Sequence, residues 1–337
     1  MRSPDDSHLH APELRHRAAV SLPELHLKDW RPTKDTLHLY AQIVGKIRLA
    51  TTPPRNHWWN APLYVGVRGL TTRRLHHHGT TFEIAFDFVD HALVVQTSDG
   101  RTRSFELADG LSVSEFDAQL HATLDELGVD VEITERPYGV PMTTPFPLDV
   151  EHASWDRAAI ERYARVLDWS DWVLEEFSGW FRGKTSPVHH FWHSFDLAVT
   201  RFCGRDAPPM EADLVAQEAY AQEVISFGFW AGDDSVGDAA YYSYTAPEPE
   251  GLREQPLAVG EWVESGNGSL ALLSYDAVRS AHDPRATLLA FLQSAYEAGA
   301  RLAGWDTDSF ESRWCPSPEQ RRDIHSTAVS DLGRSQT

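Results

Sequence analysis

The order of apolar and polar residues divides the first half of the chain into helices and strands. Apolar residues recur at helical spacing over residues 37–47, which predicts an amphipathic helix. Over residues 82–88, phenylalanine and isoleucine alternate with other residues in strict period two, which predicts a strand with one buried face. A second helix is predicted over residues 112–128, because Ser112 and Glu115 form the capping box that begins many helices.

The second half of the chain repeats this order of elements. A long amphipathic helix is predicted from about Trp155 to Trp180, strands follow it, and residues 286–306 form a closing helix. A proline-rich segment separates the halves and is predicted to be a linker. We therefore predict an α+β fold with two pseudo-symmetric lobes, each an antiparallel sheet flanked by helices. The predicted divisions are a disordered N-terminal tail, the first lobe, the linker, the second lobe and a C-terminal tail, over residues 1–22, 23–135, 136–149, 150–306 and 307–337.

Two segments, residues 57–69 and 190–202, align with each other without a gap. The alignment pairs His57 with His190, Trp59 with Trp192, and Arg68 with Arg201. Identical residues in a shared order, on elements of the same predicted type, favour an internal duplication. Duplicated domains usually associate around a pseudo-twofold axis, which would bring equivalent residues together at the seam, where ligands often bind. The matched residues can converge in one pocket there or mark two separate pockets, and both alternatives remain open.

The acidic composition narrows the choice of partners. The chain has 30 Lys and Arg residues against 50 Asp and Glu residues, which gives a formal net charge of −20. This balance disfavours binding to nucleic acids and to anionic membranes, both of which need clustered positive charge. Two cysteines provide neither a disulfide framework nor a zinc motif, and no apolar run approaches the roughly 18 residues of a transmembrane helix. The N-terminus lacks the apolar core of a signal peptide, so we expect a cytoplasmic protein. The sequence favours no particular oligomeric state.

Five long segments carry a resemblance to a known family. They are TLHLYAQIVGKIRLA, NHWWNAPLYVGVRGLTT, FEIAFDFVDH, GKTSPVHHFWHSFDLAVTRFCGR and FLQSAYEAGARLAGWD, within a stretch of roughly residues 25–306. In these segments the chain resembles the bacterial DUF5996 family. Because that family is named for its unknown function, the resemblance implies no activity, cofactor or catalytic residue.

The densest group of candidate chemical side chains is the segment HHFWHSFD. Its His189, His193 and Asp196 are a candidate ligand set for Zn or Fe(II), although their spacing matches no established metal motif. If the segment is extended, His189 and His193 share a face and His190 points to the other, whereas in a helix His190, His193 and Asp196 would fall roughly on one side. His57, beside two tryptophans, is either a general base in an aromatic pocket or a buried histidine that holds a turn. We take His57, His189 and His190 as the candidate catalytic residues, and hydrogen-bonded core histidines as the alternative.

Four cations lie next to apolar segments of this acidic chain: Lys46, Arg68, Lys184 and Arg201. They can anchor a carboxylate or phosphate of a small ligand, or they can pair with internal carboxylates such as Asp87. With Trp59 and Trp192 they form the predicted substrate-binding set. The leading hypothesis is an enzyme that acts on a small anionic molecule, with or without a metal. The alternative is a non-catalytic ligand-binding or interaction protein in which the histidines and tryptophans are structural.

Overall fold

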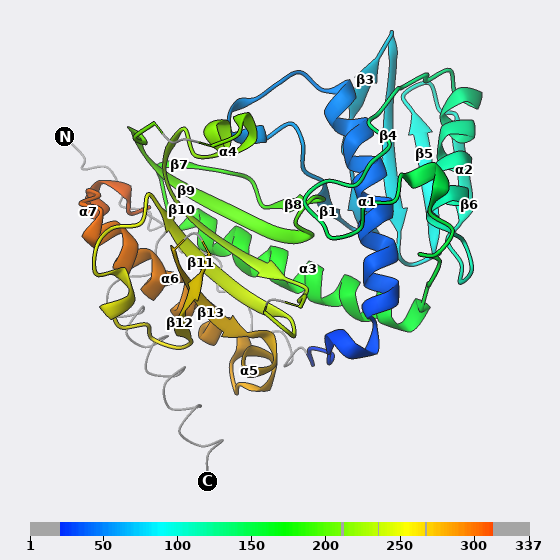
Figure 1. Cartoon of the computed structure of the whole chain (residues 1–337). Helices are drawn as coiled ribbons and strands as arrows, with labels where there is room; N and C mark the ends of the chain where they lie inside the picture. The colour runs from blue at the N-terminus through cyan, green and yellow to red at the C-terminus, as the bar shows by residue number, and fades with distance from the viewer. Residues whose placement is uncertain (1–20, 210–211, 235, 267, 313–337) are drawn as a thin grey trace, which may run out of the picture.

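The computed structural model describes residues 21–209, 212–234, 236–266 and 268–312, which form two antiparallel sheets with helices packed on them (Figure 1). The predicted α+β fold is confirmed, and the two sheets fit the prediction of two lobes. No helix within these ranges is long and apolar enough to cross a membrane.

The first sheet has the strand order β1-β2-β4-β5-β6, and β3 pairs with the other end of β4. Its strands are β1 (Tyr64–Gly66), β2 (Gly69–Thr71), β3 (Leu75–His77), β4 (Thr80–Asp87), β5 (Ala92–Thr97) and β6 (Thr102–Glu106). Its helices are η1 (Leu27–Asp29), α1 (Arg31–Thr51), η2 (Asn56–Trp58), α2 (Val113–Glu126) and η3 (Phe146–Leu148). The alternation predicted for β4 buries Phe82, Ile84 and Phe86 in the core, and the Ser112–Glu115 capping box begins α2.

The second sheet has the strand order β12-β13-β11-β10-β9-β7, and β8 pairs with the other end of β9. Its strands are β7 (Lys184–Thr185), β8 (His189–Phe191), β9 (Asp196–Asp206), β10 (Gln222–Trp230), β11 (Ala240–Ala246), β12 (Glu261–Ser265) and β13 (Gly268–Ser274). Its helices are α3 (Arg157–Gly179), α4 (Leu214–Ala219), η4 (Leu252–Glu254), α5 (Tyr275–Ser280), α6 (Pro284–Leu302) and α7 (Thr307–Phe310).

The two sheets share a connectivity that the gapless alignment does not reproduce. In each sheet, two short strands lie along one edge of a long strand, so β2, β3 and β4 correspond to β7, β8 and β9. His57, however, lies in the turn η2 before the sheet, whereas His190 lies in β8. Arg68 lies in an exposed loop, whereas Arg201 is buried within β9. The residue pairing is therefore wrong, because a few identities in short segments do not specify the register, and the duplication itself stays a prediction.

The lobes are joined by backbone hydrogen bonds and by a shared helix. Leu63 and His190 exchange two backbone hydrogen bonds, of 2.8 and 2.9 Å, which link β8 to the chain just before β1. Helix α3 contacts β1 of the first sheet and β9 of the second. These contacts hold the two sheets in a defined relative position, with the seam between them.

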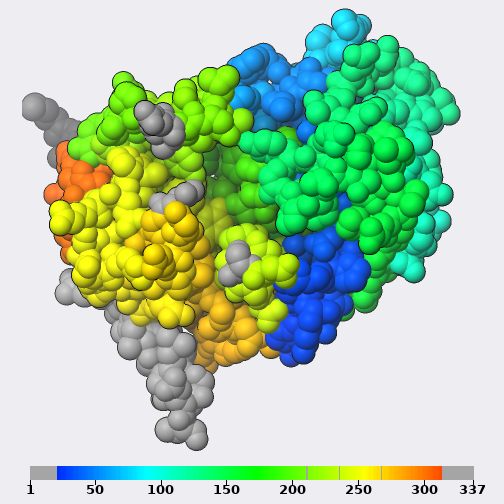
Figure 2. Space-filling model, viewed as in Figure 1, coloured from blue at the N-terminus to red at the C-terminus, as the bar shows by residue number. Residues whose placement is uncertain are grey.

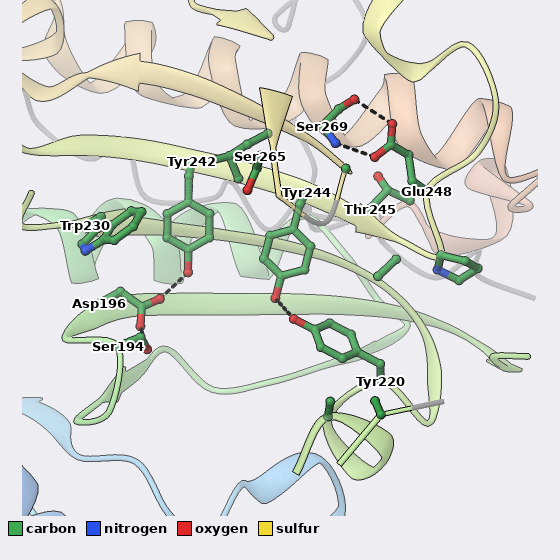
Figure 3. Close-up of a pocket in the computed structure, with 16 residues that line it drawn as sticks. Ser194, Asp196, Tyr220, Trp230, Tyr242, Tyr244, Thr245, Glu248, Ser265 and Ser269 are labelled. Atoms are coloured by element: carbon green, nitrogen blue, oxygen red, sulfur yellow. Dashed lines mark hydrogen bonds between the residues drawn. The ribbon is translucent and has the colours of Figure 1, made fainter. Parts of the chain in front are cut away.

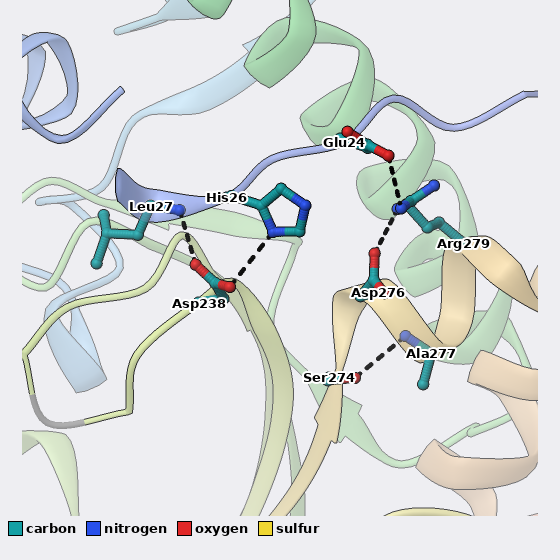
Figure 4. A network of polar contacts seen from close by, with 8 residues as sticks. All are labelled: Glu24, His26, Leu27, Asp238, Ser274, Asp276, Ala277 and Arg279. Carbon is teal, nitrogen blue, oxygen red and sulfur yellow. Dashed lines mark hydrogen bonds and ion pairs between the residues drawn. The ribbon is translucent and has the colours of Figure 1, made fainter. Parts of the chain in front are cut away.

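The segment before α1 binds the opposite lobe (Figure 4). The backbone N–H of Leu27 donates to Asp238 at 2.8 Å, and the His26 Nδ1 lies 3.3 Å from the same carboxylate. Glu24 pairs with Arg279 of α5 at 3.2 Å. The first lobe is thus tied to the second through its own N-terminal extension.

Two predicted boundaries differ from the structure. The predicted C-terminal tail contains α7 at its start, and the Phe310 ring lies 4.9 Å from that of Phe181. The predicted linker at 136–149 packs on the first lobe, where the Tyr138 N–H donates to Gln42 at 2.8 Å. The predicted N-terminal tail lies outside the described residues, apart from its last two positions.

Candidate functional site

A cavity of about 590 Å³ lies between the two lobes. The first lobe contributes α1 and η2 to its wall, and the second contributes β8, β9 and α4. The space-filling view shows a hollow near the centre of the molecule, between the surfaces of the two lobes (Figure 2). Its lining is mainly aromatic and aliphatic. We call this the inter-lobe cavity. Its lining includes Lys46, His57, Trp59, His189, Trp192 and Asp196.

His189 and His190 lie on opposite faces of β8, as an extended segment requires. His189 lines the inter-lobe cavity and is only 1% exposed, and burial, aided by Arg48 and Arg73, lowers its pKa to about 3. Its Nε2 has no hydrogen-bond partner within the described ranges. His190 faces the core instead, and its Nε2 lies 2.9 Å from the Tyr163 hydroxyl. His190 does not reach the cavity and is no longer a candidate for catalysis there.

Trp192 forms the part of the inter-lobe cavity wall that packs against α1. Its indole N–H donates to the carbonyl of Ala61 at 3.0 Å. A Cβ on Gly45 would lie 2.1 Å from the indole, so glycine is what allows the helix and the ring to touch. Lys46 follows directly, and its Nζ lies 5.6 Å from the centre of the Trp192 ring. Burial lowers the Lys46 pKa, and its ammonium group forms no hydrogen bond or ion pair with any described residue.

A lysine–histidine pair from the two lobes forms a second feature of the site. The Lys184 Nζ lies 2.7 Å from the His57 Nε2 and 2.6 Å from the Gln222 Oε1. Because an ammonium group only donates, His57 accepts at Nε2 and carries its hydrogen on Nδ1, 3.3 Å from the Ala219 carbonyl. Burial lowers the pKa of both groups, and the Lys184 charge lowers that of His57 further. Trp59 lies beside the pair, with its ring centre 5.5 Å from the Lys184 Nζ.

The turn that carries His57 has an unusual backbone. His57 and Trp58 both adopt left-handed conformations, with φ of 55° and 57°. Residues other than glycine seldom adopt this conformation; histidine does so more often than most, and tryptophan is not among the enriched residues. The Trp58 indole donates to the Val215 carbonyl of α4 at 2.9 Å, so contacts with the second lobe hold the turn.

Asp196 marks the point where the inter-lobe cavity meets a second cavity, of about 580 Å³. Its carboxyl group accepts hydrogen bonds from the hydroxyls of Ser194 and Tyr242, and burial raises its pKa against their lowering effect (Figure 3). Tyr242 reaches Asp196 by crossing Gly228 on the intervening strand β10, where a Cβ would lie 2.5 Å from the hydroxyl oxygen. The sequence analysis missed this contact, because Asp196 and Tyr242 lie on strands that no local pattern relates.

Of the four predicted anchors, only Lys46 lines a cavity; Lys184 contacts the lining residue His57, whereas Arg68 and Arg201 lie apart from both cavities. Arg68 pairs with Asp87 at the end of β4 and with Asp90 in the turn after it, which is the internal pairing that the sequence left open. Arg201 is 2% exposed and donates to the Phe177 carbonyl on the core side of β9. Side chains alternate along a strand, so Arg201 faces away from the cavity that its neighbours line.

The predicted metal ligands line the inter-lobe cavity but do not converge. Within the described ranges, no group of three or more His, Cys, Asp or Glu side chains is placed to hold a metal ion. His193 packs against the rings of Trp192 and Phe191, while both Asp196 oxygens are occupied by hydroxyl donors. The histidines of this segment therefore act as separate groups and not as one ligand set.

Comparison with known proteins supports the resemblance seen in the sequence. A model described as a family of unknown function, DUF5996, matches residues 22–312. No curated protein and no solved structure matches the chain. Because the match covers nearly all of the two lobes, the protein belongs to the DUF5996 family.

Proposed function

We propose that the protein is an enzyme that acts on a small, flat and negatively charged molecule bound in the inter-lobe cavity. The observation that carries this proposal is the Lys46 ammonium group, which lines an aromatic cavity and lacks a partner among the described residues. Lys46 is half-buried, and a partly desolvated cation without a counter-ion costs free energy that an anionic ligand would reduce. The indole rings of Trp59 and Trp192 favour a flat ligand, since aromatic rings stack on planar groups.

The Lys184–His57 pair supplies the proton transfer in this proposal. Burial lowers both pKa values, which brings the titration of the lysine closer to neutral pH, where acid–base catalysts work best. Lys184 uses two of its three hydrogens on His57 and Gln222. Lys184 does not itself line the inter-lobe cavity, whereas His57 does, so in this proposal Lys184 acts on a substrate through His57. His189, which is neutral and has an unpaired nitrogen, is the second candidate for contact with the reacting group.

A matched pair of fluorescent probes tests the anion site. Anilinonaphthalene sulfonate carries a negative charge on flat rings, and phenylnaphthylamine has the same rings without the charge. We expect Lys46→Met to weaken binding of the sulfonate by about tenfold or more, because a charge-assisted hydrogen bond is lost. Binding of the neutral probe should stay unchanged, and Lys28→Met, at an exposed position, should affect neither. Equal losses for both probes in the Lys46 variant would contradict the proposal.

Turnover is tested separately. The wild-type protein is incubated with a small-molecule cell extract, and depleted and newly formed anions are identified by mass spectrometry. Lys184→Met and His57→Gln should abolish the conversion while leaving sulfonate binding nearly unchanged, because neither residue holds the negative group. If the wild-type protein binds anions but depletes none, the enzymatic part of the proposal is wrong and the alternative of a non-catalytic binding protein holds.

A further inference from the structure

Three tyrosines and a tryptophan of the second lobe form the aromatic part of the second cavity's lining. Tyr242 and Tyr244 project side by side from β11, with stacked rings whose centres are 6.2 Å apart (Figure 3). Tyr220, at the end of α4, faces Tyr244 edge-on, also at 6.2 Å, and Trp230 lines the cavity at the end of β10. We term this the tyrosine cavity; it is defined by Asp196, Tyr220, Trp230, Tyr242, Tyr244 and Glu248.

The charged lining of the tyrosine cavity is entirely acidic. Asp196 and Glu248 are its only ionisable carboxyl groups, and no Lys, Arg or His among the described residues lines it. The Glu248 oxygens accept hydrogen bonds from the backbone N–H and the hydroxyl of Ser269. Neither carboxyl group forms an ion pair with a described lysine, arginine or histidine. The cavity therefore places two carboxyl groups that lack a basic partner among the described residues beside aromatic rings.

The polar atoms of this cavity are largely engaged with one another. The Tyr220 hydroxyl donates to the Tyr244 hydroxyl at 3.2 Å, and the Tyr242 hydroxyl donates to Asp196. A primary amine or a hydrated metal ion would compete for these same oxygen atoms. A quaternary ammonium group needs no hydrogen bonds, because it is held by ring surfaces and by diffuse negative charge.

From this arrangement we propose that the tyrosine cavity binds an organic cation of the quaternary ammonium class, held between the tyrosine rings and the carboxyl groups of Asp196 and Glu248. Four of the six residues that define the tyrosine cavity also line the inter-lobe cavity, where Lys46 lies: Asp196, Tyr220, Tyr242 and Tyr244. The cation site does not depend on the function proposed above, since no residue that defines it belongs to the Lys184–His57 pair or contacts Lys46 in that argument.

Choline and its neutral isostere dimethylbutanol, in which a tert-butyl group replaces the trimethylammonium group, are the probes. Isothermal titration of the full-length protein should show choline binding at least about tenfold more tightly than dimethylbutanol. The tyrosine rings and the carboxyl groups attract the positive charge, which only choline carries. Equal affinity for the two probes, or no binding of choline, would overturn the proposal. Lys46→Met should leave choline binding unchanged, so a failure of the anion site and a failure of the cation site are distinguishable.

Substitutions of the lining residues test whether choline binds in the tyrosine cavity. Glu248→Gln removes one charge while keeping a hydrogen-bonding side chain, and is expected to weaken choline binding several-fold, whereas Glu250→Gln, at an exposed neighbouring position, should not. Tyr244→Leu should abolish most of the preference for choline over dimethylbutanol, while Tyr244→Phe should retain it, because the ring rather than the hydroxyl contacts the cation. Thermal melting reports whether each variant is folded. Unchanged binding in folded Glu248→Gln and Tyr244→Leu would place choline elsewhere and refute the site.

Discussion

Lowering the pH from 7 to 5 is expected to reduce the free energy of unfolding by about 6 kcal/mol through three buried histidines. Burial lowers the pKa of His38, His189 and His190 to about 3 from the 6.5 of an exposed histidine. Below pH 6.5 these three histidines bind protons in the unfolded chain but stay neutral in the folded protein. Their contribution is therefore complete above pH 6.5 and is lost progressively towards pH 3, at about 2 kcal/mol each by pH 5.

Carboxyl groups whose pKa is raised by burial act in the opposite direction; they include Asp117, Asp171 and Asp196. Burial and the neighbouring carboxylates Glu175 and Asp168 raise the pKa of Asp171 to about 7. The folded protein then binds a proton more readily than the unfolded chain, which offsets at most about 2 kcal/mol of the loss between pH 7 and 5. The three histidines and Asp171 together are expected to lower the free energy of unfolding by about 4 kcal/mol between pH 7 and 5, a large share of the stability of an ordinary domain.

Urea unfolding at pH 7, 6 and 5, followed by tryptophan fluorescence, measures this dependence. His190→Gln removes one titrating group, so the loss between pH 7 and 5 should shrink by about 2 kcal/mol. Its stability at pH 7 also falls, because Tyr163 loses a partner, and so the change with pH is the quantity to compare. His282→Gln, at an exposed position, is the control. If the His190 variant shows the same pH dependence as the wild type, the buried-histidine account fails.

Gly45→Ala is expected to destabilise the protein by about 2 kcal/mol or more, although alanine normally favours a helix by about 1 kcal/mol over glycine. The new Cβ would lie 2.1 Å from the Trp192 ring, far inside van der Waals contact. The indole cannot retreat easily, since it is buried and donates to the Ala61 carbonyl. Either α1 or the ring must move, and the inter-lobe cavity loses part of its wall.

Gly179→Ala provides the matched control for this prediction. Gly179 is the last residue of α3, and a Cβ there would meet no atom within 4 Å. The same substitution should therefore be neutral or stabilise by up to about 1 kcal/mol. Chemical denaturation gives both stabilities, and titration with the sulfonate probe should show weaker binding in the Gly45 variant alone. Similar stabilities for the two variants would show that the contact between α1 and Trp192 relaxes without cost.

The sequence by itself determined the elements whose signals lie within a few residues. The helix predicted over residues 37–47 lies inside α1, and the capping box of Ser112 and Glu115 closes as expected. Alternation along β8 correctly indicated that His189 and His190 would point to opposite sides. These features depend on backbone geometry over one or two turns or strand steps, so a single segment contains the information that specifies them.

The tertiary structure alone decided which of these groups meet. Lys184 and His57 are 127 positions apart in the sequence, and no local pattern relates them. Whether Arg201 faced the cavity or the core depended on the register of β9 within its sheet. The role of Gly45, which allows α1 to touch the Trp192 ring, is visible only in the folded structure. Register and lobe packing follow from the summed burial of many side chains, which the residues of one segment do not specify.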